Sequence, residues 1–146
     1  MAEPTDPTQA IRQLNRELGK FPAELRKAMR PALKTAAEPI VADAKLRAAW
    51  SARIPRAITL SIRFARRDPG VSLRVRSAVA PHGRPYEGIT GATSFRHPLF
   101  GRRGARDWQV QKTRPYLAPA VEAGQSGALA AAVAAIDKTA RDLGFR

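Results

Sequence analysis

The sequence has no cysteine and only two histidines, His82 and His97, among its 146 residues. Without cysteine there is no disulfide framework, no thiolate metal site and no cysteine nucleophile, and two histidines leave little for a zinc site or a histidine-centred relay. Both lie in a glycine-rich region and belong to no catalytic motif. We therefore predict a protein that is not an enzyme, with no catalytic or metal-binding residues and no cofactor.

Aromatic residues are also scarce, at 6% of the chain, although 44% of the residues are hydrophobic. A chain of this length fits one domain, 1–146, with a light core. The longest apolar stretch, 128–136, is mostly alanine and much shorter than the roughly 20 residues of a membrane span. Acids and prolines occupy the first seven residues, where a secretory signal would be basic and then apolar. We expect no membrane partner and a cytoplasmic origin.

Positive charge, in contrast, is abundant. The formal net charge is +14, from 26 Lys and Arg against 12 Asp and Glu. Residues 47–114 hold 15 basic and 3 acidic residues, so the excess is concentrated in the middle of the chain. Such a block predicts an anionic surface nearby, which could be nucleic acid, a layer of lipid headgroups or an acidic protein. Composition does not choose among them.

The first third of the chain has the apolar spacing of helices, within a helical region 8–50 that follows a flexible leader, 1–7. A short first helix would carry its apolar side chains at Ile11, Leu14 and Leu18. A longer helical pattern starts near Pro22 and fades around Trp50. Pro31 and Pro39 fall inside it, and each removes a backbone hydrogen bond. We expect kinks or a break there.

A period of two follows over residues 58–76. Apolar residues alternate with polar ones on both sides of Asp68-Pro69-Gly70, which is typical of a type II turn. The pattern predicts an antiparallel β-hairpin with apolar side chains on one face. The other face would carry Arg63, Arg74 and Arg76.

The rest of the chain predicts a loop, a strand and a helix. Residues 80–107 are rich in glycine and arginine and show no period, which predicts a long loop. A strand is expected at 108–112 and a C-terminal helical region at 115–144, whose last helix would begin after Ser126 and end at Gly144. The predicted fold class is α+β: N-terminal helices, a small antiparallel sheet built on a β-hairpin, a C-terminal helix and a long arginine-rich loop.

Arginines and aromatic residues interleave between residues 95 and 116, and three interpretations remain open. Basic side chains hold phosphates and aromatic rings stack on bases, as in a nonspecific nucleic-acid-binding module. Alternatively, the aromatic rings anchor the loop to the core, which we favour over base stacking. In the third interpretation the chain is a subunit whose neighbours complete its packing, and an ordinary basic monomer with a mobile loop fits the residues equally well.

The linear order of four segments resembles a family of long-tailed bacteriophage neck or tail-completion proteins, which connect head and tail. These segments are the helical region ending near Ala44-Lys45, the strand from Ile58, the segment 86–91 (Tyr-Glu-Gly-Ile-Thr-Gly) and the segment 114–120 (Arg-Pro-Tyr-Leu-Ala-Pro-Ala). In that family a Tyr/Glu/Gly/Thr-like segment precedes a proline-aromatic-leucine-x-proline-alanine segment that leads into the final helix. The similarity spans about residues 25–143, with two departures: Ile89 separates Gly88 from Thr90, and the stretch from Gly91 to Trp108 has no counterpart in the family.

The resemblance implies a structural virion protein that is assembled in the host cytoplasm and lies at the head-tail interface. It would form a homo-oligomeric ring, a hexamer, through which double-stranded genome DNA passes without sequence specificity. Implied partners are further copies of the chain, head-closure or adaptor proteins, and tail-terminator or tail-tube proteins. A tail-terminator ring protein of the same assembly is a variant of this hypothesis, and a nonspecific nucleic-acid-binding module is the alternative from another class.

Charge arithmetic indicates what the arginines would contact in such a ring. A layer about 30 Å tall encloses about 18 phosphate charges of duplex DNA, whereas six central segments bring about 72 positive charges. Most arginines should therefore face protein, with residues 94–108 reaching into an adjacent subunit and acidic rings as neighbours. The predicted subunit-interface residues are Arg96, Phe100, Arg102, Arg103, Arg106 and Trp108. A structural corner is predicted at Pro115, Tyr116, Leu117 and Pro119.

Overall fold

The computed structural model describes residues 9, 12–13, 22–65, 67, 70–98, 104 and 107–144. Its elements are α2 (Ala23–Arg47), α3 (Ile54–Ala57), β1 (Ile58–Arg63), β2 (Gly70–Val75), α4 (Gly83–Glu87), the 3-10 helix η1 (Ile89–Gly91), β3 (Ser94–Pro98), β4 (Trp108–Lys112) and α5 (Leu117–Asp142). Long helices near both ends and two separate antiparallel strand pairs confirm the predicted α+β class. The leader and most of the predicted first helix lie outside the described residues.

We expected kinks or a break at the prolines of α2, and the helix is not broken, because it is continuous over 25 residues. Pro31 and Pro39 both lie on the exposed side of the helix, where water can bind the two carbonyl groups that lose their partners. The apolar stripe faces the opposite way. Its buried members are Leu25, Met29, Leu33, Ala36, Ala37, Ile40 and Ala44.

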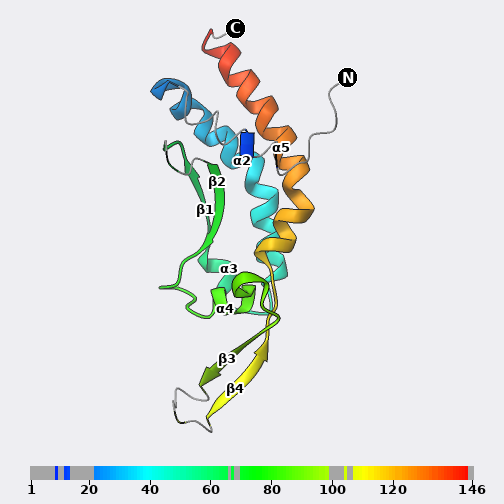
Figure 1. Cartoon of the computed structure of the whole chain (residues 1–146). Helices are drawn as coiled ribbons and strands as arrows, with labels where there is room; N and C mark the ends of the chain where they lie inside the picture. Colours follow the sequence, from blue (N-terminus) through cyan, green and yellow to red (C-terminus); the bar gives the residue numbers. More distant parts are fainter. Residues whose placement is uncertain are drawn as a thin grey trace.

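Helix α5 packs along α2 (Figure 1) and is also longer than expected. It begins at Leu117 rather than after Ser126, which lies within the helix. The expectation was wrong because the group that binds the first turn of α5 comes from a distant part of the chain. The helix ends at Asp142, just before Gly144, whose φ is +80°.

Strands β1 and β2 form the predicted hairpin, with Leu60 opposite Leu73 and Ile62 opposite Val71. Arg63, Arg74 and Arg76 are exposed, as expected. Two arginines of α2 cover the outer edge of β1: Arg26 donates to the carbonyl of Phe64 at 3.2 Å, and Arg30 to that of Ile62 at 2.9 Å.

The core follows α2 as two clusters. One is centred on Ile54, Ile58 and Tyr116, and the other on Leu25, Met29 and Phe64. Half of the buried apolar residues in the described part of the chain are alanine, so each contributes little buried area. The described helices include none with the length and apolar character that a membrane crossing requires.

The segment 80–107 is not the long loop that the sequence predicted, because it contains α4, η1 and β3. Strand β3 pairs with β4 in an antiparallel hairpin, Ser94 opposite Lys112 and Pro98 opposite Trp108. We call β3 and β4 together the arm. In Figure 1 the arm extends away from both long helices and from the β1–β2 hairpin. Its strands lack a full apolar face, which is why β3 showed no period of two in the sequence.

Candidate subunit interface

Two of the four segments that resemble the family, 86–91 and 114–120, meet at the start of α5. The Glu87 carboxylate accepts three backbone hydrogen bonds of 2.8 Å each, from the N–H groups of Tyr116, Leu117 and Ala118. Pro119 follows and has no N–H to satisfy. Every donor that the first turn would otherwise leave open is therefore accounted for. The negative carboxylate also lies at the positive end of the helix dipole.

Tyr116 fixes this junction to the core. Its side chain is fully buried, and its hydroxyl donates to the carbonyl of Gly83 at 2.8 Å. A Cβ atom at position 83 would lie 2.7 Å from Cγ1 of Val75 and 3.0 Å from the Tyr116 hydroxyl, so only glycine fits there. Burial raises the pKa of the Tyr116 phenol well above its ordinary value of about 10, and the Glu87 carboxylate raises it further.

Stability should therefore fall at alkaline pH through Tyr116. Because the phenol is harder to ionise in the folded chain, its contribution is complete below about pH 10 and is lost as pH rises beyond that. Tyr116→Phe should cost about 1–2 kcal/mol at pH 8, since the Gly83 carbonyl loses its partner. It should also flatten the decline between pH 8 and pH 11 in urea unfolding. Equal declines in the variant and the natural chain would contradict this role, and Tyr86→Phe, which keeps Tyr116, is the control.

A chain of aromatic contacts connects the base of the arm to the body. The ring of Tyr86 meets that of Trp50 at 4.7 Å and that of Phe95 at 5.0 Å, both edge to face. The guanidinium carbon of Arg114 lies 5.3 Å from the centre of the Trp50 ring. The backbone N–H of Arg114 donates to the carbonyl of Tyr86 at 2.8 Å. The orientation of the arm is thus determined by residues on both sides of the Glu87 junction.

The outward face of the arm exposes apolar side chains. Residues directly opposite in an antiparallel pair share a face, so Trp108 and Val110 of β4 lie with Pro98 and Arg96 of β3. Val110 is 70% exposed and Trp108 38%. Two strands alone are marginally stable in water, and this hairpin leaves apolar side chains exposed.

The structure places two of the six predicted interface residues on this arm. Arg96 is exposed on β3, and Trp108 begins β4. Phe100, Arg102, Arg103 and Arg106 lie outside the described residues. The four predicted corner residues form the passage from β4 into α5: Pro115 and the fully buried Tyr116 precede the helix, and Leu117 and Pro119 lie in its first turn.

Sequence reasoning missed Glu87 as a ligand of the helix start, and it also missed Val110, Trp50 and Gly83. A Glu three residues after a capping residue is a recognisable signal, but a Glu 30 residues before the helix is not. The sequence shows that Trp108 and Val110 alternate with glutamines, but it does not show that their side chains are exposed.

His82 contacts Ser51, with Nε2 and Oγ 3.4 Å apart. The same hydroxyl accepts from the N–H groups of Arg53 and Ile54 at 3.3 Å, which binds it to the start of α3. Among the described residues no group of three or more His, Asp or Glu side chains could hold a metal ion.

Comparison with known proteins adds no relative: no family model, no curated protein and no solved structure matches this chain.

Proposed function

We propose that this chain is a structural subunit of the neck of a long-tailed bacteriophage, a tail-completion or head-tail joining protein. It assembles as a ring, a hexamer, in the virion, and genome DNA passes through the centre. Its neighbours are head-closure or adaptor proteins on one side and tail-terminator or tail-tube proteins on the other. A tail-terminator ring of the same assembly differs only in these neighbours.

The exposed arm is the observation that carries the proposal. It extends from a body with an alanine-rich core and presents Val110 and Trp108 to solvent, as expected of a subunit whose neighbours complete its packing. The Glu87 junction adds support, because backbone N–H groups of the segment 114–120 donate to the Glu87 carboxylate of the segment 86–91, and both segments resemble the family. A structural role accounts for both segments.

A nonspecific DNA-binding module is the second candidate, and the outward face of the β1–β2 hairpin favours it. Arg74 and Arg76 are exposed there, and Arg76 reaches the carbonyl of Arg56 at 3.5 Å. Between Asp43 and Glu87 the sequence contains only one acidic residue, Asp68. A patch of this kind attracts phosphates.

Light scattering on the full chain, alone and with a head-closure or tail-tube protein of the same phage, separates the two candidates. The neck proposal expects a defined ring once the neighbour is present, weak binding to free duplex DNA, and the chain among the proteins of purified virions. A monomer in both samples that binds duplex DNA, with affinity falling steeply as salt rises, would replace it with the second candidate.

A further inference from the structure

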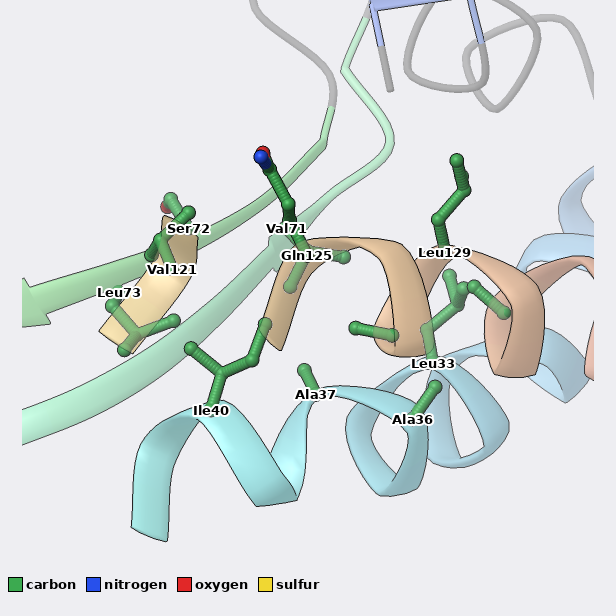
Figure 2. A pocket seen from close by; sticks show the side chains of 12 residues that line it. Leu33, Ala36, Ala37, Ile40, Val71, Ser72, Leu73, Val121, Gln125 and Leu129 are labelled. Carbon is green, nitrogen blue, oxygen red and sulfur yellow. The ribbon is translucent and has the colours of Figure 1, made fainter. Parts of the chain in front are cut away.

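An apolar cavity of about 230 Å³ opens where β2 faces the two long helices (Figure 2). Its lining includes Ile40 of α2, Leu129 of α5, and Val71, Ser72 and Leu73 of β2. Val71 and Leu73 point toward the helices, whereas Ser72 belongs to the opposite face of the strand. Because all three line it, the cavity lies beside the outer edge of β2 and not only beneath the sheet.

The backbone along this edge has no hydrogen-bond partner within the part of the chain that the structure describes. The backbone N–H of Arg76 donates to the Ala57 carbonyl at 2.9 Å. By the register, every second residue of β2 from there bonds to β1 in the same way. The N–H and C=O groups of Val71, Leu73 and Val75 therefore point away from β1. Within the described chain no hydrogen bond reaches them. The other edge of the hairpin is the one that Arg26 and Arg30 cover.

The sheet is also too narrow for the helices beneath it. Packed helices lie 8–10 Å apart, but neighbouring strands only about 4.8 Å, so two strands cover about one helix. The hairpin packs mainly on α2. On α5, Val121 borders the cavity and is 36% exposed. One more strand beside β2 would lie over α5 and close the cavity.

Strand β4 has the free backbone edge, the length and the apolar face that a strand added beside β2 requires. The Thr113 N–H donates to the Thr93 carbonyl at 3.0 Å, so by the register the backbone groups of Val110 and Lys112 point away from β3. Strand β4 has five residues and β2 has six, so the two strands are of similar length. Trp108 and Val110 share one face, and the glutamines at 109 and 111 share the other.

We propose that β4 of one copy adds to the outer edge of β2 of a second copy, with Val110 and Trp108 over the apolar cavity. The arm of the same copy cannot do this, because it points away from its own β2 (Figure 1). Charge agrees: Lys112 is exposed on the arm, and Glu122, exposed beside Val121, makes no ion pair within the described chain. The contact joins two different surfaces, so it runs head to tail, as the contacts within a ring of identical subunits do. It rests on the proposed role as a ring subunit and names the surfaces that meet.

Substitution at Val110 tests the contact without disturbing the fold. Because Val110 is 70% exposed, Val110→Lys should leave the thermal unfolding temperature of the unassembled chain unchanged. It should weaken self-association, measured by sedimentation under ring-forming conditions, at least tenfold. Gln109→Lys introduces the same charge one residue away on the opposite face and should associate normally. Equal association of the two variants would overturn the proposal.

Cross-linking identifies the occupant directly. A photoreactive benzoylphenylalanine at position 72, in a mixture of isotopically heavy and light full-length chains, should attach to the tryptic peptide 107–112 of the other chain. Attachment to residues 1–21 would instead assign the edge to the N-terminal segment and overturn the inference. Rings that form without the 72-to-107–112 product overturn it too, but leave the proposed function intact. A chain that stays monomeric even with its neighbours present refutes both.

Discussion

Replacing Glu87 by alanine should lower the free energy of unfolding by about 3 kcal/mol. The substitution removes three charge-assisted hydrogen bonds, each worth about 1.5 kcal/mol or more, and water replaces them only in part. Two of the three donors, the N–H groups of Tyr116 and Leu117, are partly buried. Urea denaturation followed by circular dichroism measures the loss.

Two further variants separate the role of this carboxylate from a general effect of charge. Glu87→Gln keeps one acceptor oxygen but no charge, so it should lose about half as much. Glu122→Ala removes an exposed carboxylate from α5 that makes no hydrogen bond within the described chain, and it should change stability by less than about 0.5 kcal/mol. A loss for Glu87→Ala no larger than that for Glu122→Ala would contradict the capping role.

Replacing Gly124 by alanine should destabilise the chain by about 2 kcal/mol, although alanine is the better helix former. A Cβ atom at position 124 would lie 2.6 Å from Cγ1 of Ile40, a buried side chain of α2. Overpacking costs about 1–3 kcal/mol, and so short a contact with a buried side chain places it at the upper end, about 2 kcal/mol above the helix-propensity gain of about 1 kcal/mol. Thermal and urea unfolding of the full chain both report the difference.

Gly127 provides the matched control three residues later in the same helix. A Cβ atom there meets nothing within 4 Å, so Gly127→Ala should raise stability by about 1 kcal/mol. If the two substitutions change stability in the same direction, the close approach of α2 and α5 at Gly124 does not exist as described.

Local patterns predicted the elements whose signals are local. The β1–β2 hairpin followed from strict alternation on both sides of a proline-glycine turn, and the stripe of α2 from helical spacing. Elements that depend on distant partners escaped prediction. The start of α5 depends on Glu87, and β3 pairs with β4 while both of its faces lack a continuous apolar row, so neither showed its structure in its own residues.

The candidate site was predictable in location more than in content. Interleaved arginines and aromatic residues drew attention to residues 94–108, and Arg96 and Trp108 do lie on the arm. Composition could not indicate that these residues belong to a hairpin that extends from the body. It also could not place Trp50, which contacts Tyr86 only because the fold brings the turn after α2 next to α4.

The guanidinium groups of Arg26 and Arg30 have a consequence for what this chain does at high concentration. Sheets with two bare edges recruit strands from both sides and extend without limit into fibres. Here one side is already occupied, so stacking through β1 would first have to displace both arginines. The β1–β2 hairpin consequently offers a single docking edge, a valence that suits closed assemblies of fixed size and resists aggregation.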